Sequence, residues 1–411
     1  MGLAVRLALM AALGWTSPAL AKGFPPVAYR QGVAFPARQA DLDHALVAHY
    51  RDWKGLYLTE GCGGGRAYVA VDADGKWRGG DGGDGTLTVS EAHGYGMLAL
   101  VMMAPVDKDA HRLFDAMVRF RRDHPAAGHA HLMAWKQVTG CGNAGADDGG
   151  DHSATDGDLD IAYALLMAEK RWGDGGKIDY GAEARATLAA ILGADVTPDN
   201  VLLIGDWARG GATFGQVTRS SDLMMSHFRS FAAATGEDRW RAVRSIGYRL
   251  LAAATAGLDT GLSPDFITGV PLDPKPAPPD LVEGPGDGFQ AWNAMRTPWR
   301  LALDDVLFGA PEAHAVLSRY NRFLVDATGG DPARLADVYR LDGQPVSADG
   351  PPSLAAVAMA AAATLADPEA HAWQVRLWRE LRRRPADKSD YYGNTLKLMA
   401  LITLAGHWEK S

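Results

Sequence analysis

Apolar residues recur at every third or fourth position through most of the chain, which is the spacing of one buried helix face. Leu42, Leu46, Tyr50 and Trp53, in the segment 41–56, illustrate the pattern. The same spacing predicts twelve further helices, at 90–103, 108–122, 132–137, 155–172, 182–192, 221–235, 238–256, 293–308, 312–326, 352–365, 370–383 and 391–408. Loops rich in Gly, Pro and Asp join them. The pattern therefore predicts an all-α fold.

Two stretches depart from the helical spacing. Residues 67–71, Ala-Tyr-Val-Ala-Val, are typical of a strand and precede an Asp74-Gly75 turn and a loose loop at 79–85, which predicts a small β-hairpin. Residues 260–291 hold seven prolines, yet apolar helices flank them, so we expect a long loop within one domain. About a dozen helices in one domain fit a closed helical toroid. Composition alone leaves an α-solenoid open, although no fixed repeat is visible.

Composition narrows the class of protein. The 411 residues are 47% hydrophobic and 22% charged, as in an ordinary globular protein, and the net charge of -8 argues against nucleic acid as a partner. Arg6, the apolar run 7–15 and Ala19-Leu20-Ala21 are typical of a cleaved signal peptide, residues 1–21. No later segment has 18 uncharged apolar residues. We expect a secreted or periplasmic protein with a single domain at 22–411.

The chain has two cysteines, Cys62 and Cys141. In an oxidising compartment they can pair, and two buried reduced thiols are the alternative. Cys62 follows the first long helix, and Cys141 lies in the loop before the acidic segment described below. Both positions border the same end of a toroid, so we predict a disulfide.

The first segment with candidate chemistry runs from Val89 to Met97. Ser90 is predicted to be an N-cap, which puts Glu91 in the first helical turn, where the positive helix end favours a carboxylate. A cap-assisting role would explain Glu91 on its own. Gly94 and Gly96 each cost a helix about 1 kcal/mol relative to Ala, however. We therefore expect a partner helix or a ligand to approach this helix closely.

The second segment, residues 153–168, opens an apolar helix with Asp156, Asp158 and Asp160. Helix-dipole stabilisation explains one or two such acids but not three, since their mutual repulsion must be offset. A calcium loop is the rival interpretation. It lacks the glycine turn and the acidic twelfth position, so a helix start with a catalytic carboxylate is preferred.

The third segment, residues 292–304, contains Arg296, Pro298 and Arg300. Pro298 indicates a first-turn position or a kink. The two arginines are spaced to share one helix face, and the Pro-Trp pair beside them suggests a packed, specific site.

Together these motifs resemble glycoside hydrolase family 8. The signature A-[ST]-D-[AG]-D-x-x-[IM]-A is matched at 154–162, S-E-x-x-x-Y-G-M at 90–97 and R-x-P-W-R at 296–300. The segments 218–229 and 391–396 also look like this family, in the expected order. The resemblance implies an (α/α)6 barrel and an inverting endo-glycosidase that needs neither metal nor cofactor.

The resemblance also implies residue roles. Glu91 matches the general acid, and Asp156 matches the carboxylate that holds and distorts the sugar. Asn293 stands where many members carry the general base, so a loop Glu is expected to serve instead. Glu283 is the only Glu between residues 260 and 293. Asp280 and Asp287 compete with it, and a merely solvated Glu283 is nearly as good an interpretation. Tyr95, Asp158, Asp222, Asn293, Arg296 and Tyr392 are the expected substrate-binding residues.

The substrate class is less determined. We expect a polysaccharide, β-1,4-glucan in preference to chitosan, acted on by a monomer. Asp147, Asp148 and Asp151 could favour polycationic chitosan, but loop acids are usually just solvated. The alternatives are a chitosanase on the same scaffold, or a catalytically dead glycan-binding protein, which Asn293 and the aromatic content motivate.

Overall fold

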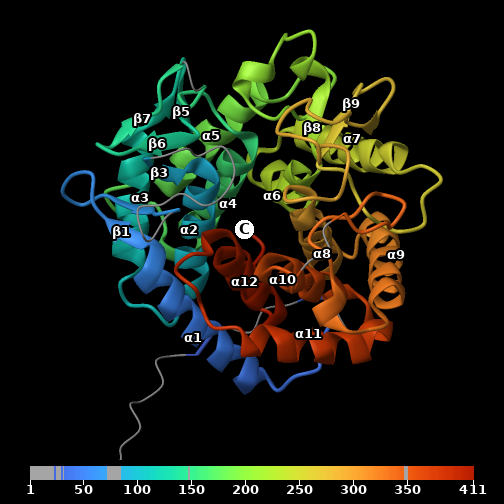
Figure 1. Cartoon of the computed structure of the whole chain (residues 1–411). Helices are drawn as coiled ribbons and strands as arrows, with labels where there is room; N and C mark the ends of the chain where they lie inside the picture. The colour runs from blue at the N-terminus through green and yellow to red at the C-terminus, as the bar shows by residue number, and fades with distance from the viewer. Residues whose placement is uncertain (1–22, 25–28, 31, 72–84, 147–148, 347–349) are drawn as a thin grey trace, which may run out of the picture.

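Six helices form an inner ring around the axis of the molecule (Figure 1). Each packs against the next, and α12 returns to α2, so the ring closes. α10 is buried at all of its residues, because a helix that is apolar on every side must be enclosed. The inner helices are α2 (Ser90–Met103), α4 (Thr155–Trp172), α6 (Met225–Thr235), α8 (Thr297–Phe308), α10 (Leu354–Ala363) and α12 (Tyr391–Leu404).

Six further helices surround the ring, each packed on one inner helix. They are amphipathic, with one face toward the ring and one toward solvent. The outer helices are α1 (Gln39–Tyr57), α3 (Ala110–Asp123), α5 (Tyr180–Ala194), α7 (Asp238–Ala254), α9 (Pro311–Thr328) and α11 (His371–Arg383). The computed structural model describes residues 23–24, 29–30, 32–71, 85–146, 149–346 and 350–411. Over these ranges the predicted toroid is confirmed, and the closed ring rules out the solenoid. None of the helices described there combines the length and the apolar character needed to cross a membrane.

One end of the ring is filled by Trp408, which follows α12. Its side chain is fully buried, and its ring lies 5.4 Å from that of Trp299 in α8 and 6.3 Å from that of Tyr163 in α4. Glu409 forms an ion pair with Arg171 near the end of α4. Figure 1 shows the chain end in the middle of the ring. The predicted helix 391–408 thus ends at Leu404. Trp408, which closes the barrel, lies in the segment after that helix.

Short strands are more frequent than the sequence pattern predicts. They are β1 (Leu58–Glu60), β2 (Ala67–Val69), β3 (Thr86–Val89), β4 (Pro125–Ala126), β5 (His129–Met133), β6 (Lys136–Val138), β7 (Gly142–Asn143), β8 (Val217–Arg219), β9 (Phe266–Thr268) and β10 (Lys275–Pro276). The predicted helix 132–137 is wrong, because β5 and β6 occupy it and pair with β4 and β3. The predicted strand 67–71 exists as β2, but it pairs with β1 before it. The hairpin turn at Asp74-Gly75, like the leader at 1–21, lies outside the described residues.

A small sheet stands beside the ring. Strands β10, β9 and β8 pair antiparallel in that order, with Arg219 opposite Phe266. We call these strands the side sheet. They cover a separate apolar cluster consisting of Leu203, Ile204, Ala208, Val217, Phe266 and Ala277, with Phe214, Leu281 and Val282 packed against it. The proline-rich stretch 260–291 is therefore less irregular than predicted, since it supplies two strands and the loop 280–288 that packs on this side core.

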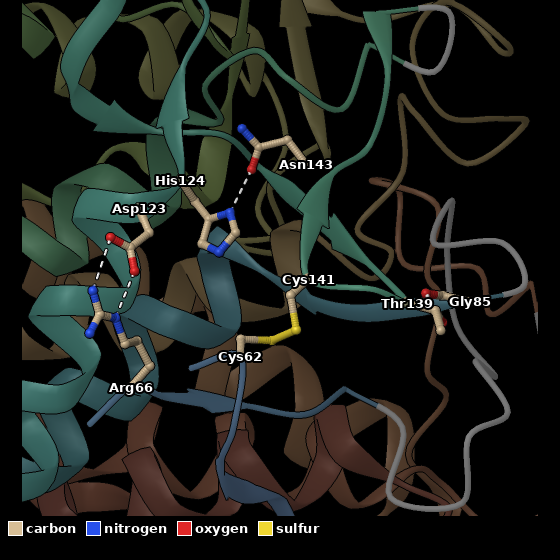
Figure 2. Close-up of a disulfide and its surroundings, with 8 residues drawn as sticks. All are labelled: Cys62, Arg66, Gly85, Asp123, His124, Thr139, Cys141 and Asn143. Atoms are coloured by element: carbon tan, nitrogen blue, oxygen red, sulfur yellow. Dashed lines mark hydrogen bonds and ion pairs between the residues drawn. A yellow bond between two sulfur atoms is a disulfide. The ribbon is translucent and has the colours of Figure 1, made fainter. Parts of the chain in front are cut away.

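The two cysteines are joined. Cys62, in the loop after β1, is bonded to Cys141 at the β6–β7 turn, with Cα atoms 5.5 Å apart (Figure 2). Next to it, Arg66 Nε lies 2.7 Å from Asp123 Oδ2 at the end of α3. The predicted disulfide is confirmed, and it links the strands that precede α2 to those that precede α4.

Candidate active site

Two glycines let the N-terminal ends of α2 and α4 touch backbone to backbone. A Cβ placed on Gly94 would lie 2.8 Å from Asp160 Cβ, and one on Gly157 would lie 2.4 Å from Ser90 Oγ. Neither position has room for a side chain. The expectation that a partner helix approaches α2 closely is confirmed, and the contact brings Glu91 and Asp156 to the same place.

The start of α2 differs by one residue from the prediction. The helix begins at Ser90 with Val89 as its N-cap, and the buried Ser90 Oγ has no hydrogen-bond partner. Ser90 N–H instead donates to the carbonyl of Trp135 (2.9 Å). Packing against Gly157 therefore takes the place of the predicted capping bond, and Glu91 still lies in the first turn.

Glu91 is paired with Arg296. Its side chain retains 20% of its exposure. Burial raises the pKa of Glu91 to about 7, against the pull of Arg296 and with help from the negative charge of Asp156. One turn further along α2, Tyr95 is fully buried with its hydroxyl 3.5 Å from Arg296 Nη1. The pKa of Glu91 thus lies near neutral pH, well above that of an ordinary glutamate.

Asp156 behaves in the opposite way. Its Oδ2 lies 3.0 Å from Arg296 Nη1 and 3.2 Å from Arg219 Nη1. Burial alone would raise the pKa of Asp156, but the two guanidinium groups outweigh it and hold the pKa below its ordinary value. Two neighbouring carboxyls with opposite shifts are typical of acid–base sites.

The other two acids of α4 point in different directions. Asp160, one turn below Asp156, accepts two bonds from Arg300 (2.9 and 2.6 Å). Asp158 lies on the opposite face, fully buried, and accepts from Met133 N–H (2.9 Å) in β5. Burial raises the pKa of Asp158 to about 8. The sugar contact expected of Asp158 is not supported by this position.

Asn293 connects the Arg296 guanidinium to the loop 280–288. Its Oδ1 accepts from Arg296 Nη2 (2.8 Å), and its Nδ2 donates to Glu283 Oε2 (2.7 Å). A carboxylate at this position could accept but not donate, and would repel Glu283. The backbone here is fixed by Asp265, which accepts from the N–H groups of Ala291, Asn293 and Ala294.

Glu283 is brought to the site and its two competitors are not. Besides Asn293, Arg219 Nη2 lies 3.3 Å from Glu283 Oε1. Asp287 is buried, and its carboxylate accepts from the N–H groups of Val282, Glu283 and Gly284, so it builds the turn that carries Glu283. Asp280 is exposed, with a left-handed φ of 58°.

The remaining two expected residues differ in burial, because Asp222 is fully buried and Tyr392 only partly so. Asp222, in the turn before α6, is fully buried, and its Oδ2 lies 3.6 Å from Arg219 Nη1. Tyr392, at the start of α12, donates its hydroxyl to the carbonyl of Trp292 (2.5 Å). The Trp292 indole is half exposed and meets the Tyr392 ring edge-on, with centroids 6.4 Å apart.

Three residues at this site were missed by sequence reasoning: Arg219, Asp265 and Trp292. Arg219 and Trp292 lie inside the motif segments 218–229 and 292–304, but nothing in those segments marks their partners. Asp265 lies in the proline-rich stretch and carries no local signal. Within the described residues, no three or more His, Cys, Asp or Glu side chains group in a way suited to a metal ion.

A closed ring of paired helices with two carboxyls whose pKa values are shifted in opposite directions fits a glycoside hydrolase of the (α/α)6 class. Residues 53–406 match the model for glycosyl hydrolases family 8. The chain is 36% identical to a β-glucanase of Niallia circulans, over 94% of this chain and 91% of the relative. It is 33% identical to an endoglucanase of Bacillus sp. strain KSM-330, over 95% of this chain and 82% of the relative.

A solved structure agrees. The apo structure of the β-1,3-1,4-glucanase from Paenibacillus sp. X4 superposes with a TM-score of 0.87 at 35% identity, covering 96% of this chain and all of the other. The chain belongs to glycosyl hydrolases family 8, and it is a glycoside hydrolase similar to endoglucanases.

Proposed function

We propose that this enzyme cuts internal β-1,4 linkages of a β-glucan with inversion of configuration. Glu91 protonates the leaving glycosidic oxygen, Glu283 takes a proton from the attacking water, and Asp156 positions the sugar. The water oxygen bonds to the anomeric carbon as the glycosidic bond breaks. Glu91 is left ionised and Glu283 protonated, and exchange with solvent restores both.

One observation carries this proposal: the contacts from Glu91 to Arg296, from Arg296 to Asn293 and from Asn293 to Glu283. The two carboxyl groups are separated by a guanidinium and an amide. Inversion requires an acid and a base held roughly 6.5–9.5 Å apart so that water fits between them. The raised pKa of Glu91, caused by its burial, supports the acid role.

A glucan is favoured over chitosan on electrostatic grounds. Glu91, Asp156 and Glu283 are each already paired with a guanidinium. The ammonium of a glucosamine unit here would face Arg219 and Arg296, whereas the hydroxyls of glucose carry no charge to repel. Of the loop acids that could favour chitosan, Asp147 and Asp148 lie outside the described residues. Names of the relatives above, β-glucanase and endoglucanase, point the same way.

The substrate-contacting surface proposed here comprises Asn293, Arg296 and Tyr392, extended by the half-exposed Trp292, an aromatic face suited to a sugar ring. Tyr95, Asp158 and Asp222 are left out, since all three are fully buried. We further propose that residues 22–411 act as one catalytic domain and as a monomer, secreted or periplasmic after cleavage near Ala21.

Reducing ends released from carboxymethylcellulose, lichenan and chitosan test the substrate class. Release from the first two and not the third is expected, and the reverse order would make the enzyme a chitosanase. Retained binding without release from any polymer would support the glycan-binding alternative.

The base is tested by Glu283→Gln, which should lower kcat at least about a hundredfold. Azide should partly restore Glu283→Ala and give a product of inverted anomeric configuration. Asp280→Asn is a matched control from the same loop and should stay within about twofold of wild type. Near-normal activity of Glu283→Gln would remove Glu283 from the role.

A further inference from the structure

One guanidinium lies among three carboxylates of the site. Arg219 Nη1 is 3.2 Å from Asp156 Oδ2 and 3.6 Å from Asp222 Oδ2, and its Nη2 is 3.3 Å from Glu283 Oε1. The Phe266 ring of the neighbouring strand supports the guanidinium, 5.5 Å from ring centroid to Cζ. Arg219 itself is 12% exposed, so water has little access to the group.

Asp222 has no route to a substrate. Its side chain is fully buried, and Oδ2 has no hydrogen-bond partner. Ser221 Oγ donates to the other oxygen at 3.3 Å. A carboxyl buried at this depth is costly unless it serves a cation nearby, and Arg219 is the cation that its free oxygen faces. Asp222 therefore acts on the reaction through its neighbours, of which Arg219 is the one that it pairs with.

The Glu283 side chain needs contacts with neighbouring groups to fix its position. Its side chain is 37% exposed on a loop, where a glutamate otherwise rotates freely among water-facing conformers. Its two fixed contacts are Arg219 Nη2 and Asn293 Nδ2. The forked guanidinium can hold Asp156 with one nitrogen and Glu283 with the other, which a lysine ammonium cannot do in one geometry.

We infer that Arg219 is the positioning residue for the base Glu283, and that Asp222 anchors Arg219 in that place. The inference rests on the proposed role of Glu283. Arg219 ties the base to the carboxylate that positions the sugar, so the attacking water and the sugar are held by one group. Positioning of this kind acts on the catalytic step and not on ground-state binding.

A double-mutant cycle tests the inference. Arg219→Gln should lower kcat about 30- to 100-fold with KM changed less than about threefold, and Arg219→Lys should fall between Gln and wild type. In the Glu283→Ala background the cost of Arg219→Gln should shrink at least tenfold, because the group that it positions is gone.

Azide rescue adds a second test to the double-mutant cycle. The anion should restore Glu283→Ala by taking the carboxylate's place beside Arg219, and it should fail with Arg219→Gln/Glu283→Ala. Asp222→Asn should lower kcat about three- to tenfold, with no added cost on Arg219→Gln. Arg229→Gln is the matched control: Arg229 pairs with Asp304 on α8 (2.7 Å), away from Glu283, and its loss should leave kcat within about twofold.

The outcomes separate this inference from the proposed function. An active Glu283→Gln would overturn the base assignment itself. An inactive Glu283→Gln with additive costs in the cycle, or azide rescue that does not need Arg219, would overturn only the positioning role. A rise in KM with kcat unchanged would make Arg219 a substrate-binding residue instead.

Discussion

The proposed acid, Glu91, and the proposed base, Glu283, are carried by different kinds of structure. Glu91, with Asp156 and Arg296 around it, stands on helix ends that are embedded in the main core of the ring. Glu283 and Arg219 stand on a loop and a strand end above the side core, which is small and separate. The acid side is thus fixed by backbone contact between helices, and the base side by a few hydrogen bonds over a satellite cluster.

This difference suggests a division of tasks. The ring places the acid with little freedom, because shifting α2 against α4 would disturb the whole barrel. Most buried residues of the side sheet pack in the side core, although Ile267 of β9 packs in the main core, so we expect changes around the base to disturb the ring less than changes around the acid. Asn293, at the edge of the ring, joins the two regions, and so does the ion pair between Arg219 and Asp156.

The largest expected effect concerns the acid. Glu91→Gln should lower kcat about a thousandfold, because the amide keeps the shape but has no proton to give. Azide should not restore it, in contrast to Glu283→Ala, since an anion cannot donate a proton to the leaving oxygen. Glu60→Gln, at an exposed pair with Arg112, is the control and should match wild type. Turnover within about tenfold of wild type would remove Glu91 from the acid role.

The second prediction compares the same substitution in each region. Phe228 in α6 and Phe266 in β9 are both fully buried, one in the main core and one in the side core. Phe228→Ala should lower the free energy of global unfolding by about 3–5 kcal/mol. Phe266→Ala should lower it by less than half as much, yet reduce kcat more than about tenfold, because Arg219 loses its support.

Hydrogen exchange provides the readout for that pair. In Phe266→Ala the amides of the side sheet and of the loop 280–288 should exchange faster, while those of the inner helices keep their protection. Equal loss of protection in both regions would mean that the ring and the side sheet unfold as one cooperative unit.

The third prediction tests the helix contact on the acid side. Gly157→Ala puts a methyl group 2.4 Å from Ser90 Oγ, so it should cost about 1–3 kcal/mol of unfolding free energy and lower kcat/KM. Gly193→Ala is the opposite case. Nothing lies within 4 Å of its added Cβ on α5, so up to about 1 kcal/mol of stabilisation is expected. Chemical denaturation measures both, and equal effects would contradict the close packing.

The smallest expected effect is a change in how kcat/KM depends on pH. Burial raises the pKa of Glu91 to about 7, and only its protonated form can donate, so kcat/KM should fall as pH rises through about 7. Burial also raises the pKa of Asp222 to about 7. Asp222→Asn should keep the alkaline limb, and residual activity of Glu91→Gln should lack it. A limb that vanishes in Asp222→Asn would assign it to that group.

The same shifts affect stability. The folded state holds protons on Glu91 and Asp222 that the unfolded chain releases near its ordinary carboxyl pKa, about 4. Between about pH 4 and 7 the folded state therefore binds more protons, and the free energy of unfolding contributed by these groups declines as pH rises. Thermal melts of wild type and of Glu91→Gln across this window would measure the contribution.

Periodicity was enough to predict the ring, because its helices are long and strongly apolar. It failed at 132–137, where six residues are too few to separate a helix from strands whose pairing partners lie far away in the chain. Motifs predicted Glu91, Asp156 and Arg296, since each stands at a helix start.

The remaining site residues depended on information outside local sequence. A step of two residues turns a helix by about 200°, which sends Asp158 to the face opposite Asp156. The role of Arg219 depends on the pairing of β8 with β9, and the role of Asp265 depends on its contact with the backbone at residue 293. Neither of these long-range contacts leaves a periodic signal in the sequence.

The position of α12 and Trp408 has a consequence for the order of events during synthesis. The ring closes where α12 meets α2, and Trp408 fills the barrel from the side of α4 and α8. At about 5–20 residues per second, roughly a quarter of a minute to a minute passes between the synthesis of Asp156 and that of Trp408. During that interval the ring of inner helices is still open, because α12 is not yet there to contact α2 and α10. We therefore expect the ring to close around Glu91 and Asp156 only after α12 and Trp408 have been made.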